Sequence, residues 1–310
     1  METKPKVIVI TGPTATGKSH CGIRLAQELD GEIISGDSMC VFRRMNVATA
    51  KPTPEELALV PHHLIDILEP NEKYSVVDFQ QQADALIRDC QARGKMPIIV
   101  GGTGLYIKAL LEKYEFSSVD ESAKLRRELE EFAEHNGNAA LYQRLKELDP
   151  QAAAQLKIND RRRIIRSVET ILGGDRVSVE RAPESPYEAA VYGLIMPREI
   201  LYQRINRRVD IMVEQGLFEE TKELLEEGVE GDAQSMKSIG YRQVLRYFDG
   251  EWSRQECIDK IKQATRNFAK RQITWYKKMP YIHWFELTEP PCYEACIKEM
   301  MEDLHQKNFY

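Results

Sequence analysis

The stretch Gly12-Pro13-Thr14-Ala15-Thr16-Gly17-Lys18-Ser19 decides the fold, because it matches the G-x-x-x-x-G-K-[ST] pattern of a phosphate-binding loop. The apolar run 7–10 before it predicts a buried parallel strand, and residues 21–29 after it carry apolar side chains at helical spacing. Strand, glycine-rich loop and helix thus occur in the order that the motif requires. An ordinary glycine-rich turn is the alternative, and this context disfavours it.

Each part of this loop suits an anion. Glycine lets backbone N–H groups turn inward around a phosphate, and the N-terminus of the following helix adds partial positive charge. Lys18 can reach the outer phosphate, and the hydroxyl of Ser19 can ligate Mg²⁺. The loop therefore predicts a phosphorylated ligand together with a magnesium ion.

Length and composition are those of a globular protein. The chain has 310 residues, of which 42% are hydrophobic and 30% charged, and a formal net charge of −6. No apolar stretch approaches the about 18 residues of a membrane-spanning helix, and the first residues lack the apolar region of a signal peptide. We therefore expect a cytoplasmic protein with no membrane partner, whose six scattered cysteines are reduced thiols.

The chain reads as an α/β core that is interrupted once. Short apolar runs alternate with helical stretches in the first third, which is typical of a doubly wound parallel sheet. From about residue 112 the pattern becomes helical and charged, and a strand-like run at 191–195 then returns to the sheet pattern. Further strands are predicted at 32–35, 63–67 and 97–100, helices at 77–92, 198–227 (broken at Gly216) and 293–308, and breaks in the helical part at 136–138, 149–150 and 173–174.

We therefore predict an α/β protein with a P-loop NTPase-like parallel sheet flanked by helices and an all-helical insertion domain. The predicted core consists of residues 1–112 and 199–310, and the second of these segments ends in basic helices. The predicted insertion, residues 113–198, contains the basic segment 157–166, and we expect it to bind a polyanion such as RNA.

Further strand ends supply polar groups to the predicted phosphate site. Asp37 follows the second predicted strand, and Thr103 lies in the glycine-rich turn after 97–100. Because ligands of open α/β sheets bind at the carboxyl ends of the strands, Lys18, Asp37 and Thr103 are expected in one pocket. Asp37 can hold Mg²⁺ through water in a hydrolase or accept a proton in a transferase. The alternative for Asp37 is an aspartate that caps a helix, and the alternative for the turn with Thr103 is a plain tight turn. In addition, an arginine of segment 204–208 can neutralise a second phosphate.

Basic residues cluster in two segments although the net charge is acidic. Residues 157–166 contain five Lys or Arg against one Asp, and residues 260–278 contain seven Lys or Arg, no acid, and the aromatic pair Trp275 and Tyr276. Phosphates require cations and unstacked bases require flat partners, so the two segments together favour RNA. A solvated helix face is the alternative for either segment alone.

The ordered motifs resemble one family over nearly the whole chain, the tRNA dimethylallyltransferases, also called tRNA isopentenyl transferases. The glycine loop alone occurs in many enzymes, whereas the ordered series is specific. The series comprises residues 12–19, 34–38, 48–52, 61–64, 100–106, 240–243 and 269–275. The resemblance implies transfer of a dimethylallyl group from dimethylallyl diphosphate to the exocyclic amine of the adenosine 3′ to the anticodon, with Mg²⁺ as cofactor and with diphosphate rather than ATP in the loop.

The resemblance also implies roles for single residues. Asp37 resembles the general base that accepts the amine proton, Thr103 the threonine at the reacting centre, and Arg208 the arginine that binds the leaving diphosphate. The whole loop 12–19 is implied to bind the diphosphate, with Ser19 as the metal ligand, and a monomer is expected. The residues implied to contact the tRNA anticodon stem-loop are Asp37, Ser38, Met39, Cys40, Thr103, Arg126, Arg162, Arg163, Arg166, Lys237, Gly240, Tyr241, Arg242, Lys270, Arg271, Gln272, Trp275 and Lys277.

The chain departs from the family pattern close to Asp37. Many members have Gln, Tyr and Gly where this chain has Cys40, Phe42 and Arg44. A thiol cannot make the paired hydrogen bonds of an amide, so the sequence gives no basis for readout of an adenine edge by Cys40.

Three other functions share the phosphate loop. A small-molecule kinase would bind ATP, but it does not need two basic segments or a helical insertion. An adenylate isopentenyltransferase that acts on free nucleotides would leave the tRNA-facing segments without a role. A non-catalytic, RNA-binding GTPase switch is disfavoured, because no N-K-x-D guanine-reading motif follows the fourth strand.

Overall fold

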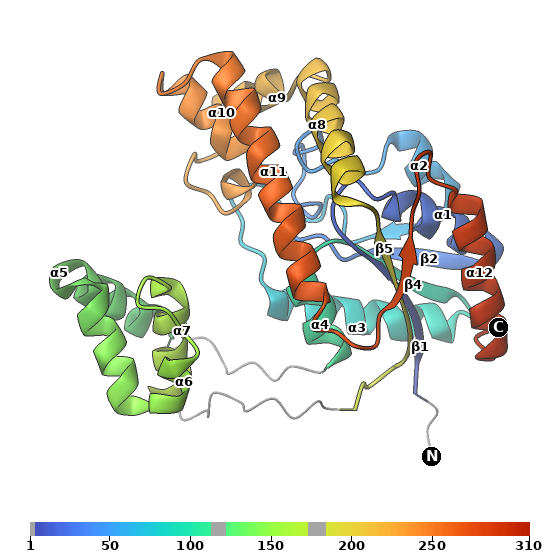
Figure 1. Ribbon diagram of the computed structural model, residues 1–310, viewed down its shortest axis with the longest axis horizontal. Helices are drawn as coiled ribbons and strands as arrows, with labels where there is room; N and C mark the ends of the chain where they lie inside the picture. Colours follow the sequence, from blue (N-terminus) through green and yellow to red (C-terminus); the bar gives the residue numbers. More distant parts are fainter. Residues whose placement is uncertain (1–3, 113–121, 173–183) are drawn as a thin grey trace. The chain divides into compact units, whose positions relative to one another are not determined.

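The computed structural model describes residues 4–112, 122–172 and 184–310 (Figure 1). Its contacts divide the chain into two compact units, one formed by Met1–Lys113 and Ser185–Tyr310 and the other by Tyr114–Glu184. The first is called the core unit and the second the helical unit. The chain therefore leaves the core unit, forms the helical unit and returns to complete the core.

The core unit is built on one six-stranded parallel sheet (Figure 1). Its strands are β1 (Lys6–Thr11), β2 (Gly31–Ser35), β3 (His62–His63), β4 (Met96–Val100), β5 (Glu188–Ile195) and β6 (His283–Glu286). Their order across the sheet is β3-β2-β4-β1-β5-β6, with parallel pairing throughout. Since β1 lies inside this sheet and is covered on both faces, residues 7–10 are all apolar and buried. The predicted α/β fold is confirmed.

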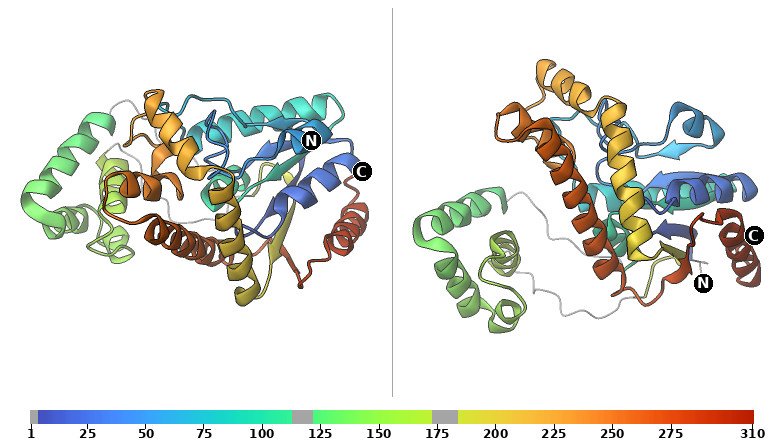
Figure 2. Two further views of the ribbon diagram at one scale, coloured as in Figure 1. Left: turned by 90° about the horizontal axis from the view of Figure 1, so that it is seen from above. Right: turned by 45° about the horizontal axis from the view of Figure 1, so that its top comes forward.

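Helices cover both faces of the sheet (Figure 1). Those of the core unit are α1 (Lys18–Glu28), α2 (Pro54–Leu59), α3 (Val76–Ala92), α4 (Gly104–Leu111), α8 (Arg198–Glu214), α9 (Leu217–Glu226), α10 (Tyr241–Phe248), α11 (Arg254–Tyr276) and α12 (Tyr293–Gln306), with a 3₁₀ turn at Ser235–Lys237. α8 and α11 pack side by side (Figure 2). The break predicted at Gly216 is confirmed, because this residue adopts a φ of +92° and separates α8 from α9.

Alternating side chains of β1 serve two separate cores. Val7 and Val9 belong to the core that also contains side chains of α3, α4 and α10. Ile8 and Ile10 belong to the core that contains side chains of α1 and α12. Both cores thus converge on the strand that leads into the phosphate loop, so the start of that loop is fixed from both faces.

The structure corrects three details of the predicted core. The strand predicted at 63–67 is only two residues long, because Leu64 and Asp66 adopt positive φ angles of 60° and 54°. The insertion predicted at 113–198 ends earlier, since β5 pairs with β1 and is part of the sheet. The sequence also gave no indication of β6, a four-residue strand that pairs with β5 at the edge of the sheet.

The helical unit has its own small core. Its helices are α5 (Ser122–Leu148), α6 (Pro150–Ala154) and α7 (Arg161–Leu172). Buried residues such as Leu141 and Ile164 join α5 to α7. The breaks expected at 136–138 and 149–150 are present, as a kink at Gly137 (φ +81°) and as the Asp149 cap of α6. The break predicted at 173–174 lies outside the described residues.

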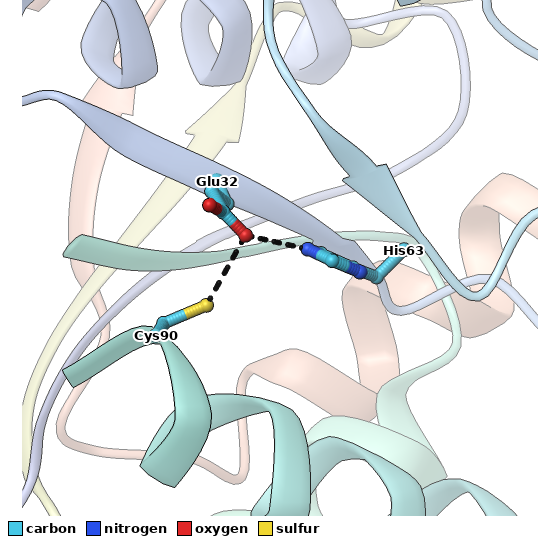
Figure 3. A group of neighbouring side chains, drawn as sticks. All are labelled: Glu32, His63 and Cys90. Atoms are coloured by element: carbon cyan, nitrogen blue, oxygen red, sulfur yellow. Dashed lines mark hydrogen bonds and ion pairs between the residues drawn. The ribbon is translucent and has the colours of Figure 1, made fainter. Parts of the chain in front are cut away.

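A charged cluster ties β2 and β3 to α3 (Figure 3). Ligand atoms of Glu32, His63 and Cys90 all lie within 4.8 Å of one another, a composition that a transition metal could use. However, the Arg93 guanidinium donates to both carboxylate oxygens of Glu32, at 2.8 Å for Oε2, and His63 Nε2 lies 2.7 Å from the same oxygen. The place of a cation is therefore taken by Arg93, and the cluster is an ion-pair network that stabilises the fold.

We expect Glu32→Gln to lower the free energy of unfolding at pH 7 by about 2 kcal/mol, because Arg93 loses its buried anionic partner. Hydrogen bonding from Arg93 holds the pKa of Glu32 at about 2, below its ordinary 4.5. This carboxylate therefore stabilises the fold above pH 4.5, and its contribution is lost as pH falls towards 2. Urea unfolding should show a smaller difference between wild type and variant at pH 3.5 than at pH 7, and an equal difference would contradict this assignment.

Candidate active site

Two turns that contain glycine meet at the carboxyl edge of the sheet. The N–H of Gly36, after β2, donates to Val100 O at 2.8 Å, and the N–H of Thr103, after β4, donates to Gly36 O at 3.2 Å. A Cβ added to Gly101 would lie 2.2 Å from the carbonyl carbon of Gly36, so the two backbones touch. This contact holds Asp37 and Thr103 at neighbouring positions.

The loop 12–19 has the shape of an anion cradle at the start of α1. Gly12 and Gly17 adopt φ angles of +137° and +89°, and α1 begins directly at Lys18. The Lys18 ammonium donates to Pro13 O at 2.8 Å. Burial, and next the nearby Arg208 guanidinium, lower the pKa of Lys18 to about 8. An anion bound here would offset both effects.

Asp37 is held in the turn that follows β2. Its Oδ1 accepts a hydrogen bond from Met39 N at 2.9 Å, and Ser38 N donates to Thr103 Oγ1 at 3.1 Å. No helix follows Asp37 directly, so the helix-capping alternative is wrong. The carboxylate instead stabilises a turn, and the Thr103 hydroxyl joins that turn to the loop after β4.

Two adjoining hollows share this edge of the sheet. The first, of about 440 Å³, is lined by the phosphate loop, including Lys18 and Ser19, and is called the phosphate chamber. The second, of about 380 Å³, is lined by Thr103 and by basic residues of the later helices, and is called the basic chamber. The residues that line both chambers are Thr14, Asp37, Thr49, Ala50, Arg208, Met212 and Phe268. Asp37 and Arg208 therefore lie where the two chambers meet.

Three arginines in the middle of α8 have different surroundings. Arg208 lines both chambers, where burial lowers its pKa and the neighbouring Asp37 carboxylate opposes that shift. Arg207 is exposed. Arg204 lies behind the loop, where its Nε donates to Ala15 O at 3.0 Å. Of the three, Arg208 alone lines the chambers, and Arg204 supports the loop from outside.

The predicted tRNA contacts of the core unit fall into two groups. Lys237, Arg242 and Arg271 line the basic chamber, and Met39, Ser38 and Thr103 line it as well. The exposed members are Lys237, Arg242, Lys270, Arg271 and Lys277. Of these, Lys237, Arg242 and Arg271 give the chamber cations that are accessible to a polyanion.

The other group is buried, which corrects the prediction that these side chains touch tRNA. Tyr241 is fully buried and donates its hydroxyl hydrogen to Glu220, and Cys40 is 6% exposed. Gly240 is also buried, and so is Gln272. Helix packing explains the error for Tyr241 on α10 and Gln272 on α11, which face the core while neighbouring residues of the same helices face solvent.

The aromatic pair on α11 does not offer two free rings for base stacking. Tyr276 is fully buried in the core. Trp275 is half-buried, and a Cβ at Gly104 would lie 2.4 Å from its Cδ1, so its ring packs against the start of α4. The interpretation of these rings as base-stacking partners is therefore wrong for Tyr276, and Trp275 contributes packing next to Thr103.

Within the helical unit, the four predicted tRNA-binding arginines also differ. Arg162 and Arg163 are exposed on α7. Arg126 pairs with the buried Glu169 at 2.7 Å, and Arg166 lies 3.6 Å from the same carboxylate. Arg162 and Arg163 are thus accessible, and Arg126 is exposed as well but is paired with Glu169 and fixes α5 against α7.

Sequence reasoning missed two groups that shape the chambers. The side chain of Lys51 is only 4% exposed, and its ammonium donates to Asp66 Oδ1 and to Phe42 O. These bonds hold the segment around Lys51, which lines the phosphate chamber. Glu220 accepts hydrogen bonds from the N–H groups of Asn46 and Val47. Lys51 lies within the motif at 48–52, whereas no local pattern marks Glu220.

Among the described residues, none of the helices combines the length and the apolar character needed to cross a bilayer. The expectation of a chain without a membrane-spanning helix agrees with this finding.

Comparisons with known proteins point to a single family. The IPP transferase family model matches residues 40–279. A tRNA dimethylallyltransferase of Exiguobacterium sp. is 46% identical over 301 residues, covering 97% of this chain and 96% of that protein. The crystal structure of a full-length tRNA isopentenylpyrophosphate transferase from Bacillus halodurans aligns with a TM-score of 0.75 at 43% identity, over 98% and 97% of the two chains. A eukaryotic dimethylallyltransferase acting on tRNA aligns with a TM-score of 0.76 at 30% identity, over 91% of this chain and 73% of that one.

We expect Gly101→Ala to lower the free energy of unfolding by about 3 kcal/mol, because a new methyl group would force the turns at Gly36 and Gly101 apart. The matched control is Gly231→Ala, where the nearest atom to an added Cβ is a Leu245 methyl carbon at 3.8 Å and the change should be close to neutral. Thermal and urea unfolding of both variants would measure the difference. Equal stability of the two variants would refute the close contact between the turns.

Proposed function

This chain belongs to the IPP transferase family, whose matched relatives are tRNA dimethylallyltransferases, and we propose on that premise how its two chambers transfer a dimethylallyl group to tRNA. The proposed donor is dimethylallyl diphosphate, with its diphosphate in the phosphate chamber. The proposed acceptor is the exocyclic amine of the adenosine 3′ to the anticodon, which enters from the basic chamber. The observation that carries this proposal is the place of Asp37 and Arg208, which line both chambers.

Asp37 is the proposed general base. An adenine amine is a weak nucleophile because its lone pair is delocalised into the ring, so removal of its proton assists attack. As the new C–N bond forms, the allylic C–O bond to diphosphate breaks and the amine proton passes to the Asp37 carboxylate. The hydrogen bond from Met39 N leaves Asp37 oriented for this role before the substrate arrives.

The leaving diphosphate requires positive charge that is already in place. Lys18 and Arg208 both line the phosphate chamber, and backbone N–H groups of the loop and the N-terminus of α1 add partial charge. Their partial burial strengthens each interaction with the developing anion. A site with restricted water also protects the allylic donor from hydrolysis.

The phosphate chamber also fits the proposed Mg²⁺ cofactor, because it offers oxygen donors beside a diphosphate site. Ser19 lies in the first turn of α1 and lines the chamber, as does Asp37. The Ser19 hydroxyl would hold the ion together with diphosphate oxygens. When bound, the ion would supply further charge for the leaving diphosphate.

The tRNA is proposed to reach the basic chamber over the exposed cations of the core unit, with the helical unit binding the same substrate through α7. Extrusion of the target base from its stack costs a few kcal/mol, and phosphate contacts can offset that cost. Membership of the IPP transferase family argues against the two alternative functions of small-molecule kinase and GTPase switch.

Asp37→Asn should reduce the rate of prenyl transfer by about 10²- to 10⁴-fold and leave tRNA affinity within about twofold. An amide oxygen can still accept the hydrogen bond of Met39 N, so the turn is preserved while the base is lost. The measurement is incorporation of labelled dimethylallyl diphosphate into unmodified tRNA. Asp30→Asn is the matched control, because Asp30 is an exposed aspartate in the turn after α1, where it pairs with Lys95. Unchanged turnover in Asp37→Asn would show that Asp37 is not the general base.

Combined replacement of Arg162, Arg163 and Arg166 by Ala should weaken tRNA binding and reduce the slope of log affinity against log salt by about 2. Glu169 keeps Arg126 as its partner in this variant, so α5 and α7 should stay packed. Fluorescence anisotropy with an anticodon stem-loop at several salt concentrations would measure the slope. Lys146→Ala is the control, because Lys146 is an exposed cation on α5. An unaltered slope in the triple variant would show that this segment is a solvated helix face and does not bind tRNA.

A further inference from the structure

Gln272 on α11 joins the phosphate loop to the loop that follows β4. Its Oε1 accepts a hydrogen bond from Thr14 N at 3.0 Å, and its Nε2 donates to Gly102 O at 2.8 Å. The residue is only 6% exposed. One side chain thus satisfies a backbone donor of the first loop and a backbone acceptor of the second.

The site around Gln272 is built for a side chain of this shape. A Cβ on Gly102 would lie 2.5 Å from Gln272 Nε2, so a side chain at that position would displace the amide from its present place. The following turn of α11 makes a second contact, between Trp275 and Gly104. α11 therefore reaches both the residue before Thr103 and the residue after it.

The same turn of α11 also carries exposed cations at the basic chamber. Lys270 and Arg271 precede Gln272 and are exposed, and Arg271 lines the basic chamber. Gln272 lines the phosphate chamber, as does Thr14, its partner. Consecutive residues of one helix thus contribute to the two chambers.

We propose that Gln272 is a positioning residue, which fixes the phosphate loop relative to the loop that follows β4 and contains Thr103, so that the donor and the acceptor meet at Asp37. This proposal rests on the proposed function, because it takes loop 12–19 as the diphosphate cradle. A buried N–H or C=O that loses its partner must find another, so loss of the amide shifts both loops. The donor site should be affected first, because Thr14 belongs to the cradle itself.

The test uses the full-length protein with Gln272→Met, which keeps the length of the side chain but removes both hydrogen bonds. We expect the Kd for inorganic pyrophosphate with Mg²⁺, measured by calorimetry, to rise about tenfold, the effect of losing about one net buried hydrogen bond. The KM for dimethylallyl diphosphate should rise by a similar factor. The Kd for an anticodon stem-loop should stay within about twofold, which a general loss of folding would not produce.

Gln243→Ala is the matched control, because Gln243 is also a glutamine 6% exposed, but it caps α10 by accepting from Gly240 N. It should lose stability and leave the pyrophosphate Kd within about twofold. Gly102→Ala approaches the same contact from the other side and should reproduce the Gln272→Met phenotype. It also serves as the test if Gln272→Met does not fold.

The outcomes separate the inference from the proposed function. Wild-type affinity for pyrophosphate in Gln272→Met and Gly102→Ala would overturn the positioning role, and so would a change confined to stem-loop affinity. A wild-type protein that neither binds pyrophosphate nor transfers the prenyl group would refute the proposed function, and the inference with it.

Discussion

Backbone contact between the turns at Gly36 and Gly101 is the constraint on which the candidate site depends. Parallel strands deliver their following loops to one edge of the sheet, but the loops approach this closely only where neither has a side chain. A Cβ on Gly101 would lie 2.2 Å from Gly36 C, and the hydrogen bond from Thr103 N to Gly36 O crosses the same junction. The distance between Asp37 and Thr103 is therefore set by main chain, which is stiffer than side chains on separate loops.

Charge is concentrated at this junction before any ligand arrives. Lys18 and Arg208 both line the phosphate chamber and are half-buried, and Arg208 contributes to the lowered pKa of Lys18, after desolvation itself. Two half-buried cations that face Asp37 and, at the phosphate chamber, Glu56 make an arrangement that a multiply charged anion near Lys18 stabilises. This balance favours an anionic ligand over a neutral one, because negative charge offsets the mutual repulsion of the two cations.

The sequence predicted those parts of the site whose residues are contiguous. The phosphate loop and Asp37 follow strands that local apolar runs reveal, so both their presence and their shared edge could be inferred. Gln272 and Tyr241 were misplaced at the tRNA surface, because their segments are basic while their side chains are buried. Residues 269, 272 and 276 repeat at helical spacing, which signals a buried face on α11, but the partners of that face lie far away in the chain.

Those distant partners explain why the phosphate loop is not a self-sufficient unit here. Thr14 N is held by Gln272 across 258 residues of sequence, and Ala15 O is held by Arg204 across 189. The contiguous loop supplies the inward-facing N–H groups, as it does in many enzymes with the same pattern. Its position relative to Asp37 comes from α8 and α11, and these helices also carry cations of the basic chamber. The interrupted core therefore needs its second segment to convert a general anion cradle into a site for two substrates.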